Sequence, residues 1–489
     1  MNELLKLSAF ALAQKIAAGE VTPTEAVEAH IAQIEKVNPA LNALVENDFI
    51  KARLTAAEQT ARLQKSRDNL PPLFGVPFTI KEMLAVQGMK RTGGSIHHCH
   101  DVMDYDATAV GRLKAAGAIP LGTTNVPELG FWFETNNPVY GCTNNPYDLK
   151  RTCGGSSGGE AALLGAGASS FGIGSDIGGS LRMPAFFCGV FAHKPSPGLI
   201  PLTGHFPYTR DDFKNVLKDD KAPYTVLGPI TRKATDLYPL MNIMMGADGY
   251  DSATKEASYL KKPEHNWLGK KVYLCPSPVF HGARRIDSEL SQQVKNCGTL
   301  FEELGAEVHE LNPRFFTRAT KLWFSALEKT KTKSFHEMLF GEATDINISK
   351  EVFKIAFGKG NYTLPNIMTS LLERLDVSTG DTDKNIAELD KMKKDLEASL
   401  GDNGILILPP HSRVAPKHHA PLWSPFDFIS TGIFTTLGMP STVIPMGLND
   451  KGLPLGVQVV AKEMNDHLTL GCAEFLETTF GGWTPPTDF

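Results

Sequence analysis

Apolar side chains recur every three to four positions through the first seventy residues, which is the period of an amphipathic helix. Within this region, the stretch VTPTEAVEAHIAQIEKV contains Thr22, Pro23 and Glu25, which match a capping box with proline in the first helical turn. A helix should therefore begin just after Thr22. We predict that residues 1–70 form a helical N-terminal arm.

The rest of the chain alternates between short apolar runs and longer amphipathic segments. Runs of this kind predict strands within residues 70–86, 118–128, 268–276 and 404–410, and a pair of strands joined by a turn within 441–462. Amphipathic periodicity predicts helices within residues 106–117, 287–311, 313–400 and 465–481, with a strand after the second of these helices. Because no linker or repeat interrupts this alternation, residues 71–489 are predicted to form one α/β domain.

Two glycine-serine loops flank an apolar segment in CGGSSGGEAALLGAGASSFGIGSDIGGSLRMP, residues 153–184. A flexible linker would have polar neighbours, whereas the segment between the loops is apolar and rich in small side chains. We therefore predict a buried helix that joins two loops fixed in the core. Each loop carries a serine at its centre.

The second loop offers consecutive backbone N–H groups from Ile177, Gly178, Gly179 and Ser180. Glycine lets such groups converge on an anion, which could be a phosphate or the oxyanion of a tetrahedral acyl intermediate. The lysine of a Walker loop and the G-x-G-x-x-G fingerprint are both missing here, which favours the oxyanion. No G-x-S-x-G elbow is present either, so a hydrolase triad of that type is not expected.

A serine nucleophile needs a base, and Lys81 stands alone within the apolar run GVPFTIKEMLAV. Burial would lower the pKa of this lysine, and the neutral amine could then accept a proton. The residues alone leave open whether Lys81 is functional or simply solvated.

Composition excludes several classes of protein. The 49 basic and 54 acidic residues give a net charge of −5, without the basic excess that is typical of nucleic-acid binding. The cysteines are scattered without a C-x-x-C pair, which indicates reduced thiols and a cytoplasmic location. The N-terminal segment is amphipathic, and no stretch reaches the roughly 18–20 apolar residues of a membrane span. We therefore expect a soluble protein.

Histidine-rich segments raise the question of a metal site. The segment SIHHCHD includes His97, His98 and His100, but neighbouring residues point in different directions, and no distant pair of ligands is evident. An exposed loop is the better interpretation. For His418 and His419 we expect structural hydrogen bonds rather than metal ligation. No metal and no other cofactor are predicted.

The segments FGVPFTIKEM, CGGSSGGEAALL and GIGSDIGGSLRMPAFFCGVFAHKPSPG resemble the amidase signature family, whose members are Ser-Ser-Lys amide hydrolases. The C-terminal stretch VAPKHHAPLWSPFDFISTGIFTTLGMPSTVIPMGLNDKGLPLGVQVVA resembles the fatty-acid amide hydrolase branch. The resemblance implies a large α/β fold with a twisted mixed sheet surrounded by helices. It also implies that Ser180 is the acyl nucleophile, that Ser156 relays protons from a loop with a cis peptide bond, and that Lys81 is the base.

By the same resemblance, further residues acquire expected roles. The N–H groups of Ile177, Gly178, Gly179 and Ser180 would form the oxyanion hole, and Asp176, Arg182 and Ser157 would support the loops. The segment ELGFWFETNNPVYG would line the acyl pocket, although a core aromatic cluster remains the alternative. Its expected substrate-binding residues are Leu129, Gly130, Phe131, Trp132 and Phe133.

The aromatic segment and the apolar C-terminal half favour fatty-acyl or aryl amides over small polar amides. Carbamates would fit the same chemistry, as in a urethane or aryl-acylamide hydrolase. One alternative is the A-type subunit of a tRNA-dependent amidotransferase, which releases ammonia from glutamine. Another is a binding protein that keeps the fold without activity. We expect a small-molecule amide as the partner and no nucleic acid, and leave homodimerisation open.

Overall fold

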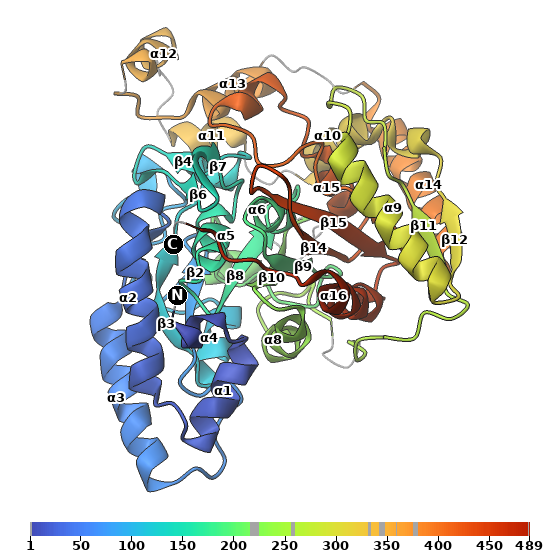
Figure 1. The fold of residues 1–489 in the computed structure, drawn as a ribbon. Helices are drawn as coiled ribbons and strands as arrows, with labels where there is room; N and C mark the ends of the chain where they lie inside the picture. Colours follow the sequence, from blue (N-terminus) through green and yellow to red (C-terminus); the bar gives the residue numbers. More distant parts are fainter. Residues whose placement is uncertain are drawn as a thin grey trace.

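One mixed β-sheet of 11 strands runs through the computed structural model of the protein, in the order β1-β3-β2-β8-β10-β9-β14-β15-β13-β11-β12 (Figure 1). The structure describes residues 2–215, 224–255, 260–330, 334–341, 348–357, 359–374, 380–487 and 489. Both parallel and antiparallel pairs occur, and helices surround the sheet, which confirms the predicted mixed α/β fold.

Short strands make up the sheet. They are β1 (Leu44–Asn47), β2 (Pro77–Lys81), β3 (Ile119–Thr124), β8 (Phe171–Asp176), β9 (Phe191–Lys194), β10 (Val226–Thr231), β11 (Lys271–Leu274), β12 (Glu307–Glu310), β13 (Ile405–Leu408), β14 (Ser441–Leu448) and β15 (Pro454–Ala461). Two small two-stranded sheets lie outside it: β4 (Asn136–Asn137) with β5 (Gly141–Cys142), and β6 (Asn144–Asn145) with β7 (Asp148–Thr152).

Helices cover the sheet from one edge to the other, with α2 and α3 beside the β1 edge and α9 and α14 at the β12 edge (Figure 1). Their bounds are α1 (Ala9–Ala18), α2 (Pro23–Leu41), α3 (Phe49–Lys65), α4 (Thr108–Ala115), α5 (Gly158–Gly165), α6 (Arg182–Phe187), α7 (Arg210–Asn215), α8 (Leu237–Met244), α9 (Ser288–Glu303), α10 (Ala319–Thr330), α11 (Phe335–Phe340), α12 (Ile348–Ala356), α13 (Leu364–Arg374), α14 (Thr382–Leu400), α15 (Ile429–Thr436) and α16 (Asp466–Phe480).

The predicted start of the second helix is confirmed. The Thr22 side chain accepts a hydrogen bond from the Glu25 N–H, and the Glu25 carboxylate accepts one from the Thr22 N–H, with Pro23 in the first turn of α2. The predicted turn near the C-terminus is confirmed as well, because β14 and β15 pair in antiparallel fashion around residues 449–452.

Two elements differ from the prediction. The sequence pattern predicts residues 44–47 as part of a helical arm, but they form β1, which pairs with β3 at the edge of the sheet. The segment between the glycine-serine loops is not one helix, because α5 ends at Gly165 and residues 171–176 form the buried strand β8. Pairing with β2 and β10, which lie far away in the sequence, decides the structure of β8.

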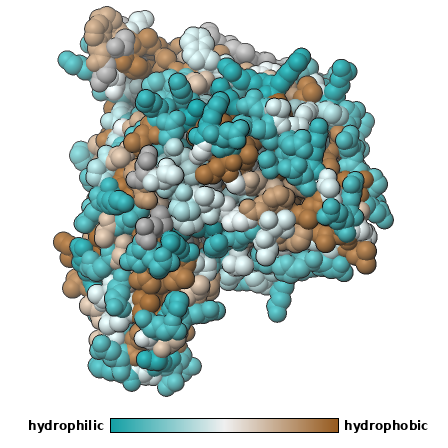
Figure 2. All heavy atoms as spheres, viewed as in Figure 1, coloured by the Kyte–Doolittle hydropathy of each residue, from teal (hydrophilic) through white to brown (hydrophobic). Residues whose placement is uncertain are grey.

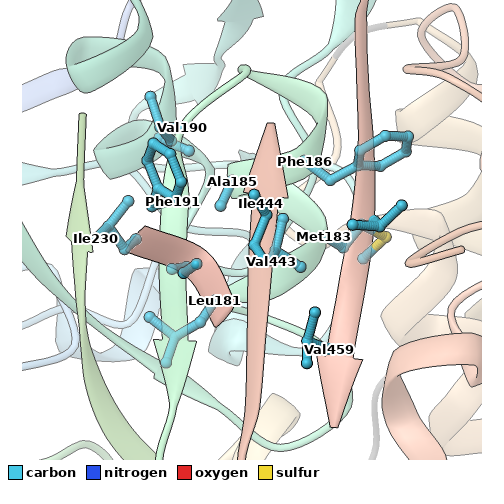
Figure 3. Packing of buried hydrophobic residues seen from close by; sticks show 14 of the residues in the cluster. Leu181, Met183, Ala185, Phe186, Val190, Phe191, Ile230, Val443, Ile444 and Val459 are labelled. Atoms are coloured by element: carbon cyan, nitrogen blue, oxygen red, sulfur yellow. The ribbon is translucent and has the colours of Figure 1, made fainter. Parts of the chain in front are cut away.

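The core fixes the start of α6 directly after the second loop. Leu181, Met183 and Phe186 are buried and belong to one cluster with Val443 and Val459, as Figure 3 shows. Side chains of α6 thus pack against β9 as well as against β14 and β15 near the C-terminus. The loop that ends at Ser180 is held at its far end by this packing.

The surface is mixed in character. Figure 2 shows hydrophilic side chains over much of the periphery and an apolar group at the protruding α12. Phe353 of α12 and Phe357, which follows this helix, are exposed. Among the residues that the structure describes, no helix is both long and apolar enough to cross a membrane. All seven cysteines are free thiols, as predicted.

Candidate active site

The side chain of Lys81 lies in the interior of the protein. The residue ends β2 between the parallel strands β3 and β8, and its side chain is fully buried. Its Nζ donates to Ser156 Oγ at 2.6 Å and to Ser175 Oγ at 2.9 Å, with a longer contact of 3.4 Å to the Ser175 carbonyl. The structure therefore brings together two of the predicted site residues from segments 75 residues apart.

Burial lowers the pKa of Lys81 to about 7, although the carboxyl groups of Asp176 and Glu160 act in the opposite direction. An amine with this pKa carries no charge in about half of the molecules at neutral pH. Lys81 can therefore accept a proton under ordinary conditions, which a solvent-exposed lysine does not do.

Ser175 and His205 extend the contacts of the lysine. His205 Nε2 lies 2.8 Å from Ser175 Oγ, the same hydroxyl that Lys81 contacts, and both residues are buried. Burial, together with the nearby cations Lys81 and Arg91, lowers the pKa of His205 to about 3, so the imidazole is neutral. A neutral imidazole accepts a hydrogen bond at one ring nitrogen.

Ser156 lies in the first glycine-serine loop, two residues before α5 begins at Gly158. Ser156 is buried, and the peptide bond between Gly155 and Ser156 is cis, as the resemblance implied. The next residue, Ser157, joins the two loops: its N–H donates to the Ser180 carbonyl at 3.0 Å, and its hydroxyl contacts the Ser175 carbonyl at 3.3 Å.

The second loop presents Ser180 and a set of backbone N–H groups. In the described part of the chain, neither the Ser180 hydroxyl nor the N–H groups of Ile177, Gly178 and Ser180 have a hydrogen-bond partner. The N–H of Gly179 differs, because it donates to Asp176 Oδ1 at 2.7 Å. Three of the four predicted oxyanion donors are therefore free, whereas the Gly179 N–H is used in a hydrogen bond within the loop.

Gly179 is required for the shape of the loop. Its φ of +109° lies in the region that favours glycine, and an added Cβ would lie 1.9 Å from Thr431 Oγ1. A side chain at this position would displace α15 or open the loop. The close packing keeps the free N–H groups next to Ser180.

Asp176 and Arg182 form a buried ion pair that spans the second loop. The guanidinium Nε and Nη2 atoms both lie 3.0 Å from the carboxylate oxygens, and neither side chain is exposed. Burial opposes the charge of Asp176, but Arg182 and the Gly179 N–H outweigh burial and lower the pKa of the carboxyl to about 2. Arg182 also donates to Gln458 at 2.7 Å and to Thr435 at 2.9 Å, which ties the loop to β15 and α15.

The predicted substrate segment passes directly over the first loop. A Cβ on Gly130 would lie 3.8 Å from Ser156 Oγ, and one on Gly155 would lie 2.5 Å from the Trp132 carbonyl. Leu129 is buried in a cluster with Met83, whereas the side chains from Phe131 to Phe133 are half-buried. The segment therefore lies close to Ser156, and its side chains are only partly buried in the core.

Aromatic side chains continue from this segment to the second loop. Phe133 stacks on Phe428 at 4.3 Å, and Phe428 contacts Trp323 at 4.8 Å. The Trp323 indole N–H donates to the Ile177 carbonyl at 3.3 Å. Phe131 lies 4.8 Å from Phe335 of α11. Aromatic side chains thus extend from the segment beside the first serine loop to the second loop.

Sequence reasoning missed several residues at the site. Ser175, His205 and Glu160 are buried within the network around Lys81, but nothing in their local sequence marks them.

The histidine-rich segments also have defined places. His97 Nε2 lies 3.0 Å from the Tyr362 hydroxyl, and His98 Nδ1 lies 2.7 Å from Asp101 Oδ2. Of the pair His418 and His419, His418 Nδ1 lies 2.8 Å from Glu134 Oε1.

Comparison with known proteins places this geometry in a family. A family model described as Amidase matches residues 25–470. Fatty-acid amide hydrolase 2-B from Danio rerio is 41% identical, over 99% of this chain and 91% of its own length. The A-type subunit of glutamyl-tRNA(Gln) amidotransferase from Lachnospira eligens is 31% identical, over 94% of this chain and 95% of its own length. A solved structure of 6-aminohexanoate cyclic dimer hydrolase has a TM-score of 0.80 at 26% identity, over 100% of this chain and 99% of that chain.

The chain belongs to the amidase family. It is a hydrolase that acts on carbon–nitrogen bonds in amides, and its sequence is close to that of fatty-acid amide hydrolase 2. The resemblance noted in the sequence is thereby confirmed.

The ion pair across the second loop generates a stability prediction. Asp176→Asn would leave the Arg182 charge buried without compensation, so the free energy of unfolding should fall by about 3–5 kcal/mol. Urea denaturation measures this change. Asp148→Asn serves as the matched control, because its ion pair with Arg151 is partly exposed and should contribute less than about 1 kcal/mol. Equal losses in the two variants would contradict the assignment.

Proposed function

We propose that the protein hydrolyses amides of hydrophobic fatty-acyl or aryl acids through an acyl-enzyme on Ser180. The observation that carries the proposal is the fully buried Lys81 amine, 2.6 Å from Ser156 Oγ in a loop joined to that of Ser180. A base that is neutral near pH 7 and lies next to a hydroxyl relay can activate an otherwise weak serine nucleophile.

The first step moves two protons. Neutral Lys81 accepts the hydroxyl proton of Ser156 while Ser156 accepts that of Ser180. Ser180 Oγ then forms a bond to the amide carbonyl carbon, and the carbonyl π electrons become a lone pair on the oxyanion. The hydroxyls of Ser156 and Ser180 are not hydrogen-bonded to each other in the structure, and such contacts often tighten only when substrate binds.

The oxyanion would lie against the free N–H groups of Ile177, Gly178 and Ser180. Losing one donor of this kind typically costs on the order of 3 kcal/mol in the transition state. The Gly179 N–H, which is bonded to Asp176, holds the loop in shape, as does the Asp176–Arg182 ion pair. The donors are thus fixed before substrate arrives.

The second half of the reaction reverses the proton path. As the carbon–nitrogen bond breaks, the Lys81 ammonium returns its proton through Ser156 to the leaving nitrogen. Water then attacks the acyl-enzyme and gives a proton back along the same path, and Ser180 leaves as the carboxylic acid is released. One lysine acts as base and then as acid, which its pKa of about 7 allows.

Ser175 and His205 would orient the lysine for this task. Because His205 is neutral, its Nε2 can accept a hydrogen bond from the Ser175 hydroxyl, and Ser175 Oγ can accept one from Lys81. With its N–H groups directed to Ser175, the neutral amine turns its lone pair toward Ser156. We assign His205 and Ser175 as positioning residues on this basis.

The half-buried aromatic segment supports a hydrophobic acyl group. Phe133, Phe428 and Met183 line a small pocket near the second loop, to which His411, Arg413 and Asp427 also contribute. Burial of a large apolar group in such surroundings stabilises a complex by about 25 cal/mol per Å² of apolar surface. A carbamate or anilide would present the same carbonyl and nitrogen to the loops.

The free thiols fit a reducing compartment, but a cytoplasmic location and homodimerisation stay predictions.

The substrate assignment predicts a ratio of rates. kcat/KM for a long-chain fatty-acyl amide or an aryl amide should exceed that for glutamine by at least about 100-fold, because glutamine cannot bury comparable apolar surface. Ammonia release and amine release measured on the lone chain give the two values. Faster turnover of glutamine would favour an amidotransferase component instead.

The nucleophile assignment predicts a single covalent label. A fluorophosphonate should modify Ser180 alone, as peptide mass spectrometry can show, and Ser180→Ala should lower kcat/KM by on the order of 10⁴-fold or more. Ser277→Ala, at an exposed serine far from Lys81 in the sequence, should leave both results unchanged. Normal turnover by the Ser180 variant would contradict the mechanism.

A further inference from the structure

Three side chains with metal-ligand chemistry meet beside the first serine loop. His418 Nδ1 lies 2.8 Å from Glu134 Oε1 and 3.6 Å from Cys142 Sγ. The three donor atoms all lie within 4.8 Å of one another. No other set of three such side chains is found among the residues that the structure describes.

We propose that Glu134, Cys142 and His418 bind one zinc ion, with water in the fourth position. A tetrahedral zinc ion with Zn–S of about 2.3 Å and Zn–N of about 2.0 Å holds sulfur and nitrogen about 3.6 Å apart, which is the separation seen here. The same geometry places nitrogen and oxygen about 3.3 Å apart. The nitrogen and oxygen therefore have to separate by about 0.5 Å, and the sulfur already lies within 4.8 Å of the carboxylate oxygen.

The backbone that carries the three ligands is already held by strand pairing and by hydrogen bonds to neighbouring strands. Cys142 belongs to β5 and lies opposite Asn136 of β4, two residues after Glu134. The segment that carries His418 runs along β7, where the His418 N–H donates to the Lys150 carbonyl and the Thr152 N–H donates to the Pro416 carbonyl. The site would therefore need little ordering when the metal binds.

Outer contacts orient two of the ligands. His418 Nε2 lies 3.3 Å from the Leu149 carbonyl, to which it can only donate, so Nδ1 is the ring atom left for a metal. Both oxygens of Glu134 accept from the His419 N–H at 3.1 Å. A hydrogen-bonded imidazole and a hydrogen-bonded carboxylate are the usual surroundings of metal ligands.

The donor set distinguishes zinc from the alternatives. An ion pair between Glu134 and His418 accounts for the 2.8 Å contact and leaves Cys142 Sγ 3.6 Å from Nδ1, with a second contact of 3.7 Å to the Thr143 carbonyl. Thiolate, imidazole and carboxylate together suit zinc, whereas calcium and magnesium prefer oxygen ligands alone. Cys142 and His418 are partly exposed, so an ion can reach the site.

Occupancy would stabilise the region that supports Ser156. Glu134 precedes Thr135, whose hydroxyl and N–H both bind the Gly154 carbonyl, at 2.8 and 3.1 Å. A zinc ion would thus tie residues 416–418 to the segment that holds the first loop. This role is structural, and the inference stands independently of the proposed reaction. The proposal departs from the expectation from sequence that no metal binds, because ligands 284 residues apart in the sequence meet only in the fold.

The experiment uses the whole chain, reduced and freed of metal with a chelator. Zinc affinity is measured by competition with a chromophoric chelator, and cobalt(II) serves as a spectroscopic probe of thiolate ligation. We expect one equivalent of zinc to bind, a rise in the melting temperature, and a thiolate-to-cobalt charge-transfer band in the near ultraviolet. Cys142→Ser and His418→Gln should each weaken zinc binding at least about 100-fold and remove the band or shift it.

Matched controls are Cys99→Ser, a partly exposed thiol outside the cluster, and His419→Asn, which keeps the backbone N–H that binds Glu134. Both controls should bind zinc as the parent chain does. Absence of stoichiometric zinc binding by the parent chain would overturn the proposal. So would loss of the charge-transfer band in Cys99→Ser with its retention in Cys142→Ser. The parent chain and the Cys99 control decide the outcome even if a ligand variant fails to fold.

Discussion

The candidate active site depends on Lys81, whose side chain is buried away from water. Taking an ammonium group into the interior costs several kcal/mol, and the protein offsets only part of this with the carboxyl groups of Asp176 and Glu160. The remaining cost lowers the pKa of Lys81 and makes a proton acceptor out of a residue that is ordinarily a cation. The hydrogen bonds to Ser156 and Ser175 then give the amine a direction.

The fold provides this environment by bringing distant segments together. The strand β2 ends at Lys81 beside β8, and β8 leads directly into the loop of Ser180. The helix α5 begins at the other serine loop and packs on the same strands, so both loops emerge from one part of the core. The Asp176–Arg182 pair and the packing of α6 hold the second loop from within. Rigid placement of this kind is what catalysis by fixed donors requires.

Local features of the fold can be predicted from sequence, whereas features decided by distant contacts cannot. The capping box at Thr22 and the hairpin at residues 449–452 involve only neighbouring residues, and both predictions are confirmed. For the strands β1 and β8 the prediction of helix is wrong, because their sequences are short and rich in small or polar residues. Their structure follows from partners elsewhere in the sheet.

The same distinction applies to the site. The loops of Ser156 and Ser180 have a recognisable sequence pattern, and the structure places Lys81 beside the first of them. Nothing around His205 indicates that it contacts Ser175, 30 residues away. Likewise, Glu134 and His418 are 284 residues apart, and their meeting with Cys142 follows only from the pairing of β4 with β5 and of residues 416–418 with β7.

The protonation state of the lysine is the central claim, and the pH dependence of the rate at which a fluorophosphonate modifies Ser180 tests it most directly. Because the proposed mechanism needs the neutral amine, the rate should rise about tenfold per pH unit below pH 7 and level off above it, with a midpoint near the Lys81 pKa of about 7. Lys81→Met should be slow and without this midpoint. A rate that is flat across neutral pH, or a midpoint near the ordinary lysine value of 10.5, would contradict the account.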